Sequence, residues 1–186
     1  MRPNRLLALV TTLLAFLAGP ALGADKAAEQ AEIRKATQSA LDKFYKAQPN
    51  LKTEVDAAPG YAVFTTYGLT FLVGGTGGGG LAHDKKTGRD TFMKMAQASA
   101  GLQAGVAQND LLIVFKSQKA LDNFVNKGWE FGGTGAVSAG VANKSAGGGA
   151  GQQEISEAKT YSLTKNGLEI GAALAGTKFW KEKGMN

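Results

Sequence analysis

The stretch Val73–Leu81, VGGTGGGGL, is dense in glycine, and its interpretation decides how the rest of the chain is understood. Gly75, Gly77 and Gly80 match G-x-G-x-x-G, the pattern of dinucleotide-binding loops. In such a loop a helix opens at the last glycine and directs its N-terminus at the pyrophosphate. Here Leu81–Gly88 follows, which is typical of a further strand and a turn. No Gly-Lys-Ser/Thr ends the run, so a Walker loop is excluded as well.

Glycine also recurs along the chain, in four strand-like segments around Gly74, Gly101, Gly132 and Gly171. A single phosphate loop does not require glycine in four separate strands. Glycine inside a strand marks a bulge, a corner or a close approach of two backbones. The glycines therefore predict a sheet that is strongly curved or closely packed.

The segments around this stretch carry strand patterns. Asp84–Gly88 has the composition of a hairpin turn, and a closing hairpin is expected around Thr164–Gly167. Leu111–Phe115 is continuously apolar, as in a buried strand. The other predicted strands are Tyr61–Thr66, Leu69–Val73, Thr91–Met95, Trp129–Val141, Tyr161–Leu163 and Leu168–Leu174.

Helices are predicted at three places. Ala24–Lys46 is rich in good helix formers with one narrow apolar face, and a short helix follows over Asn50–Ala58. Ser117 suits the N-cap of a helix over Gln118–Asn126, and Gly128 suits its end. This order predicts an α+β domain in which N-terminal helices precede a strongly curved, mostly antiparallel, glycine-rich sheet or small barrel with one inserted helix.

The first 23 residues have the layout of a secretory signal peptide. Two arginines precede the uncharged apolar run Leu6–Ala18, and the small residues Ala21 and Gly23 suit cleavage before Ala24. The run is short for a membrane span, and an uncleaved anchor helix is the alternative. We expect residues 24–186 to form one exported domain, periplasmic or peripherally attached to a membrane, with residues 24–58 as a helical lead-in.

The exported part is basic and has no cysteine. Loss of Arg2 and Arg5 with the signal peptide lowers the formal net charge from +6 to +4. A basic exported protein meets lipid head groups and envelope polymers rather than nucleic acid. The absence of cysteine excludes disulfides, thiolate metal sites and a lipoprotein anchor at the cleavage site.

No pattern of residues predicts catalysis. His83 is the sole histidine, which cannot build a histidine zinc site, and it is expected in a partly exposed turn. Ser138 has a nucleophile-elbow-like context but lacks the helix that must follow. Ser156-x-x-Lys159, Ser162-x-x-Lys165 and Lys86-Thr-Gly88 match penicillin-binding motifs in the wrong order, in a chain that is short for that fold. The sequence predicts no enzyme, metal or cofactor.

An ordered set of segments resembles a known family. The set consists of Pro59–Phe64, Gly74–Gly80, Asp84–Gly88, Ala98–Gly105, Leu111–Phe115, Ala120–Phe124, Trp129–Gly132, Ala136–Gly140 and Tyr161–Leu168. Over about residues 33–176 this succession resembles the SYLF domain, a lipid-binding module of eukaryotic membrane-trafficking proteins and exported bacterial proteins. The resemblance implies a noncatalytic domain that binds anionic lipids.

The resemblance also implies a role for the N-terminal helix, which is amphipathic and contacts the membrane in eukaryotic members. The matching segment here, Ala24–Lys46, has an alanine-rich apolar face and interspersed charges of both signs. We therefore expect packing on the sheet at least as much as insertion into a bilayer.

Two patches suit a membrane surface. Cations of the predicted hairpin should gather near one end of the sheet, each contributing roughly 1 kcal/mol near an anionic surface. A later segment pairs two aromatics with cations, a mixture that sits at head-group depth. The alternatives are a solvated turn and a terminal aromatic packed on the core. The residues are Lys85, Lys86, Arg89 and Lys94 in the first patch, and Lys178, Phe179, Trp180 and Lys181 in the second.

Two functions stay open. The favoured one is a noncatalytic peripheral protein of the cell envelope that recognises anionic phospholipid surfaces. The other is an exported structural or interaction module that binds an envelope polymer or a protein partner. Salt-sensitive binding to anionic bilayers distinguishes the first from the second.

Overall fold

The computed structural model describes residues 21–66, 75–98, 109–131, 137–138, 157–164, 167–170, 174 and 176–186. The predicted strand Leu69–Val73 and most of the predicted signal peptide lie outside the described residues. Three helices are present in this part: α1 (Ala21–Ala47), α2 (Asn50–Ala57) and α3 (Gln118–Lys127). All three were expected from the sequence at nearly the same bounds.

Nine described strands form one sheet in the order β6-β5-β9-β3-β2-β1-β4-β7-β8, and their pairings are antiparallel. Within the described residues the sheet has two ends, β6 and β8, so it is a curled half-barrel. The bounds are β1 Gly60–Thr66, β2 Gly75–Asp84, β3 Arg89–Ala98, β4 Asp110–Phe115, β5 Trp129–Phe131, β6 Val137–Ser138, β7 Ala158–Thr164, β8 Gly167–Ile170 and β9 Thr177–Lys181.

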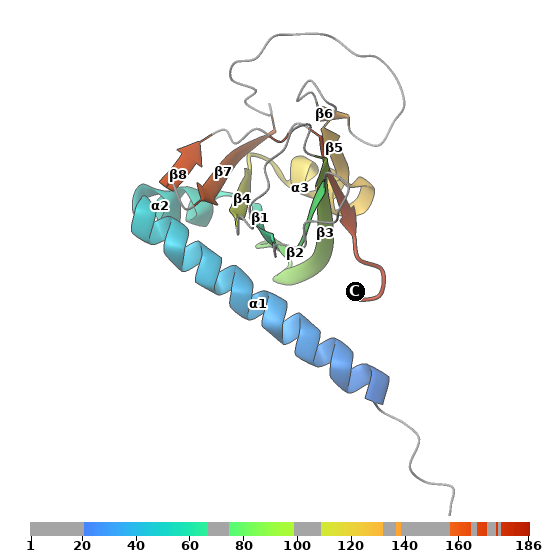
Figure 1. The fold of residues 1–186 in the computed structure, drawn as a ribbon. Coiled ribbons are helices and arrows are strands. Elements are labelled where there is room, and N and C mark those ends of the chain that lie inside the picture. Colours follow the sequence, from blue (N-terminus) through green and yellow to red (C-terminus); the bar gives the residue numbers. More distant parts are fainter. Residues whose placement is uncertain are drawn as a thin grey trace, which may run out of the picture.

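Helix α3 occupies the inner face of the curled sheet and contacts β9 in one half and β1, β2 and β4 in the other (Figure 1). Ser117 caps its N-terminus by accepting a hydrogen bond from the Ala120 N–H at 3.1 Å, and Gly128 ends it with φ of 71°. Phe124 is fully buried among aromatic rings of several strands, including Phe64 and Phe179. This aromatic cluster is the core of the domain.

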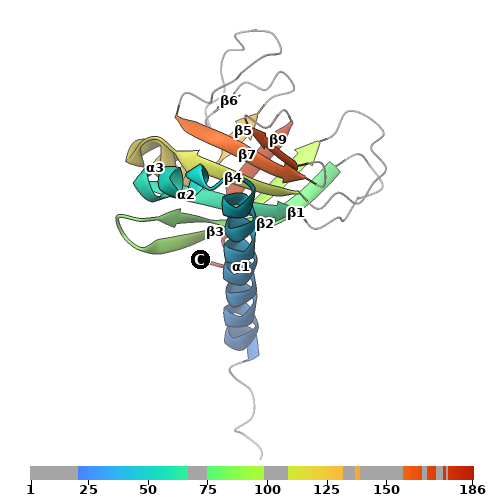
Figure 2. The same ribbon diagram turned by 90° about the vertical axis from the view of Figure 1, so that its left-hand side faces the viewer.

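Helices α1 and α2 cover part of the outer face. Leu41 and Phe44 of α1 and Leu51 of α2 pack with outward residues of β1, β4 and β7 in a second apolar cluster. Figure 2 shows α1 crossing the sheet, with the β2–β3 hairpin projecting to one side of the helix. The expectation that α1 packs on the sheet is therefore confirmed in this structure. None of the described helices combines the length and apolar character needed to cross a membrane.

The glycines of β2 divide between the two faces. On the inner face, a Cβ at Gly80 would overlap the Val63 carbonyl oxygen and lie 2.8 Å from the Phe64 Cα. A Cβ at Gly78 would lie 2.9 Å from the Thr65 carbonyl oxygen. A side chain does not fit where β1 and β2 curl this closely, so the predicted α+β fold with a strongly curved sheet is confirmed.

Strand β9 was not predicted, because the sequence pattern indicates a closing hairpin of Tyr161–Leu163 and Leu168–Leu174 as the end of the sheet. Strand β8 covers Gly167–Ile170, and residues 171–173 of the predicted strand lie outside the described residues. Residues 177–181 instead insert between β3 and β5. In Thr177–Lys181 the two aromatics Phe179 and Trp180 are adjacent, which breaks the alternation of apolar and polar residues that predicts a half-buried strand.

Candidate lipid-facing surface

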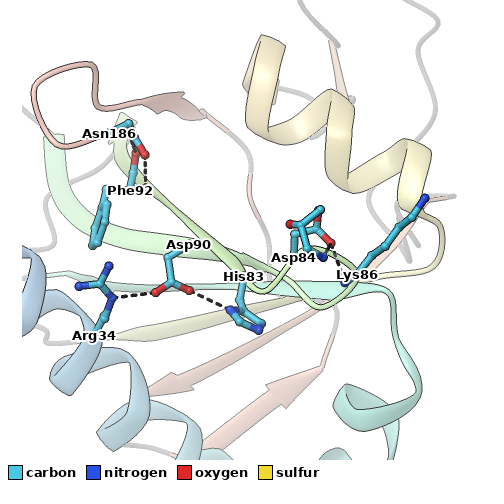
Figure 3. A network of polar contacts seen from close by, with 8 residues as sticks. Arg34, His83, Asp84, Lys86, Asp90, Phe92 and Asn186 are labelled. Carbon is cyan, nitrogen blue, oxygen red and sulfur yellow. Dashed lines mark hydrogen bonds and ion pairs between the residues drawn. The ribbon is translucent and has the colours of Figure 1, made fainter.

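The hairpin turn between β2 and β3 is held by Asp84. Its Oδ1 accepts a hydrogen bond from the backbone N–H of Lys86 at 2.9 Å (Figure 3). Its Oδ2 accepts a hydrogen bond from Gln118 of α3 at 3.3 Å. Desolvation acts to raise the pKa of Asp84, but these bonds and those from Thr87 outweigh it and the net pKa is lowered. An ionised Asp84 thus fixes the turn that presents the predicted cations.

Only part of the predicted hairpin patch is available at this turn. Lys86 and Arg89 are exposed. The Lys85 ammonium instead donates a hydrogen bond to the Val55 carbonyl oxygen near the end of α2. Desolvation lowers the pKa of Lys85. Lys85 therefore joins the hairpin to α2, and the "hairpin tip" is defined as Lys86 and Arg89.

The placement of Lys94 near this turn is wrong. Lys94 is five residues from Arg89 along β3, which corresponds to about 17 Å of extended strand. Its Cα partner is Trp180 of β9. The sequence places Lys94 close to the other hairpin cations along the chain, but only the β3–β9 register shows which residue stands beside it.

The second predicted patch is divided between the two faces of β9. Phe179 is 1% exposed and packs against Phe64, Phe124 and Phe131, so the alternative of an aromatic packed on the core holds for this residue. Lys178 and Trp180 point the other way and are exposed, and Lys181 is exposed at the strand end. Trp180 has 37% of its surface exposed, and within the described part of the chain it is the large hydrophobic residue that faces solvent.

Six outward-facing residues of β2, β3 and β9 form two cross-strand rows, and we call them the outer patch. They are Gly79, Lys94 and Trp180 in one row and Gly77, Ala96 and Lys178 in the next. The register thus joins Lys94 to the second predicted patch. Gly77, Gly79 and Ala96 also belong to this surface. They could not be selected from the sequence, because only the alternation of faces along β2 and β3 places them there.

Both lysines of the outer patch have acidic partners. Lys94 Nζ lies 2.5 Å from Glu182 Oε2, and this bond is the main cause of the lowered pKa of Glu182. Lys178 Nζ lies 3.1 Å from Glu130 Oε2, with both side chains more than half exposed. Exposed ion pairs of this kind contribute about 0–1 kcal/mol, so they leave both ammonium groups free to exchange partners.

Helix α1 separates the outer patch from the hairpin tip. Arg34 Nε lies 2.8 Å from Asp90 Oδ2, and Asp90 Oδ1 lies 2.8 Å from His83 Nδ1 (Figure 3). The Arg34 guanidinium also stands over the ring of Phe92, with Met185 packed beside that ring. The helix is about 10 Å thick, so the two cationic areas do not merge into one surface.

This polar network was not predicted from the sequence. His83 lies within β2 rather than in the turn, and it is partly exposed as expected. Desolvation acts to raise the pKa of Asp90, but the hydrogen bonds from His83 and Arg34 outweigh it and lower the net pKa. Asp90 therefore serves as an ionised link between α1 and the β2–β3 hairpin.

Comparison with known proteins identifies the family. A family model described as Ysc84, Las17-binding protein actin regulator, matches residues 96–186. Residues 96–186 thus match the Ysc84/SYLF domain family, and the predicted resemblance is confirmed. The matched range contains Ala96, Lys178 and Trp180 of the outer patch.

A bacterial relative extends the similarity toward the N-terminus. The chain is 32% identical over 169 residues to Beta cell expansion factor A of Aeromonas veronii. The similarity covers 86% of this chain and 60% of that protein. The chain thus spans about 60% of the length of this relative.

Proposed function

We propose that this SYLF protein is a noncatalytic, peripheral lipid-binding protein of the cell envelope that recognises anionic phospholipid surfaces. The observation that carries the proposal is the outer patch, where exposed Trp180 stands directly across from Lys94. Tryptophan beside lysine suits the head-group region, because the indole prefers the interface and the ammonium attracts lipid phosphates. Family membership supports the same function.

The hairpin tip supplies a second, independent source of attraction. Lys86 and Arg89 are exposed and have no ion pair among the described residues. Each cation contributes roughly 1 kcal/mol near an anionic surface, so loss of both should weaken binding about thirtyfold. The tip adds a salt-sensitive attraction that does not depend on the geometry of the outer patch.

The proposal is tested by flotation of the purified protein with vesicles of phosphatidylcholine alone or with phosphatidylglycerol, at low and high salt. We expect binding to the anionic vesicles only, weakened by salt and by the double variant Lys86→Glu/Arg89→Glu. The matched control is Lys35→Glu/Lys46→Glu, which makes the same charge change for two exposed lysines of α1. Trp180→Ala should weaken binding at both salt concentrations.

Binding that is equal for both vesicle types would contradict the proposed recognition of anionic lipid. A failure to float with any vesicle would contradict lipid binding itself and favour the second function, a module that binds an envelope polymer or protein. Equal losses in the hairpin and control variants would show that total charge matters and that the hairpin tip does not.

A further inference from the structure

The outer patch has a floor made of small residues. A Cβ added at Gly79 would meet no atom within 4 Å, and the nearest atom to one at Gly77 is the Met95 carbonyl oxygen at 3.9 Å. Ala96 adds only a methyl group and is exposed. Unlike Gly78 and Gly80 on the inner face, Gly77 and Gly79 are not required by close packing. Their effect is to leave open space on the outer face.

The register of β3 and β9 determines which long side chains surround this floor. Lys94 and Lys178 are diagonal neighbours on adjacent antiparallel strands, which places them about 7–8 Å apart at the backbone. Ala96 lies directly opposite Lys178, and Trp180 lies directly opposite Lys94. In the structure the Lys94 ammonium is held at Glu182, beside Phe92, and the Lys178 ammonium is held at Glu130 of β5. Both must therefore turn away from these carboxylates to meet above Ala96, next to the indole ring.

We propose that the outer patch is a site for a single phospholipid head group, with its phosphate above Ala96 between the ammonium groups of Lys94 and Lys178. Trp180 lies beside the head group at the level of the glycerol backbone. This inference rests on the proposed function and assigns the site at which one lipid molecule is recognised. The ligand class is a phosphodiester lipid with a head group small enough for the floor of Gly77, Gly79 and Ala96.

The acidic partners of the two lysines are compatible with this site. Each ammonium has three donors, and the ion pairs with Glu182 and Glu130 use one donor each. Both lysines are more than half exposed, so they can reorient toward a phosphate without leaving a buried charge unpaired. The two carboxylates also disfavour a ligand with several negative charges, because it would approach them closely.

The site is tested with a soluble probe, dihexanoyl phosphatidylglycerol kept below its micelle concentration, by ¹H–¹⁵N NMR titration of the purified protein. We expect saturable shifts at the amides of the outer patch. Ala96→Leu fills the floor without changing the charge and should weaken this binding at least about tenfold. Ala31→Leu, at an exposed alanine of α1, is the matched control. Thermal unfolding of both variants verifies that they are folded.

The outcomes separate this site from the proposed function. Flotation with anionic vesicles but no saturable shift with the soluble lipid would overturn the head-group site and leave the proposed function in place. Equal affinity for inorganic phosphate would overturn the commitment to a lipid. Saturable lipid binding at the patch without flotation would support the site and contradict membrane recruitment. An Ala96→Leu variant that is folded and binds normally would also overturn the site.

Discussion

Substitution of two neighbouring glycines should have opposite effects on stability. In Gly80→Ala, the new methyl group meets backbone atoms of β1, the Val63 oxygen and the Phe64 Cα, which cannot rotate away. Strand β1 must then move away from β2 at the bend that curls the sheet. In Gly79→Ala, one residue earlier, the methyl group meets open space.

The expected magnitudes follow from these contacts. Overpacking costs about 1–3 kcal/mol, and we expect about 3 kcal/mol for Gly80→Ala because the atoms that must shift belong to the strand backbone. Gly79→Ala should instead stabilise by about 0.5 kcal/mol, since alanine reduces the conformational freedom of the unfolded chain. The two variants should differ by about 3–4 kcal/mol in the free energy of unfolding, or by about 10 °C in Tm.

The measurement is thermal and urea-induced unfolding followed by far-ultraviolet circular dichroism, with the two variants compared with the wild-type protein. Gly80 lies on the crowded inner face and Gly79 on the open outer face, and this assignment predicts the difference. Equal unfolding temperatures of the two variants, or a lower stability of Gly79→Ala, would refute this assignment of faces. Either result would mean that the curl of β1 and β2 does not depend on the inner glycines.

Three further predictions concern the core, a helix cap and the ion-pair network. Phe124→Ala removes a fully buried ring of the aromatic cluster and should lower the free energy of unfolding by about 3–5 kcal/mol, measured by urea denaturation. Ser117→Ala removes the cap of α3 and should cost about 0.5–2 kcal/mol in the same assay, whereas exposed Ser39→Ala in α1 should cost less. For Asp90→Asn we predict a pH-dependent effect. The folded pKa of Asp90 lies below its ordinary value of 3.8, so its stabilising contribution is present above that pH and is lost as the pH falls through the folded pKa.

The Asp90 prediction is checked by measuring the unfolding free energies of wild type and Asp90→Asn from pH 7 down to pH 3. The difference between them should shrink as the pH falls below 3.8. A constant difference would show that the carboxylate bonds with Arg34 and His83 do not contribute through ionisation. For Phe124 and Ser117, an unchanged midpoint would contradict the assigned packing or cap.

Local signals in the sequence were sufficient for the elements that depend on near neighbours. Helix α3 is bounded by Ser117 and Gly128, and both its cap and its end lie within the pattern that predicts it. Asp84 and Gly88 likewise predict the β2–β3 hairpin, with φ of 67° at Gly88. The curvature of the sheet was also predictable, because glycine recurs in several strands and few other roles explain it.

The candidate site was predictable only in part, because its geometry depends on strand register. Lys178 and Trp180 were selected from their composition, and their exposure agrees with that choice. Phe179, in the same segment, faces the core, since adjacent residues in a strand point to opposite faces. The pairing of Lys94 with Trp180 joins distant parts of the chain, and no local pattern indicates it.

The position of β9 has a consequence for the order in which the protein assembles. This strand is the last of the described strands in the sequence, yet it lies between β3 and β5. A growing chain that has reached residue 176 contains the segments for both neighbours but nothing that joins them. Residues 182–186 then bond to Phe92 of β3 and accept hydrogen bonds from Lys26 and Gln30 of α1. The sheet between β3 and β5 therefore becomes continuous only once the segment of β9 has been synthesised, although its neighbours precede it in the chain.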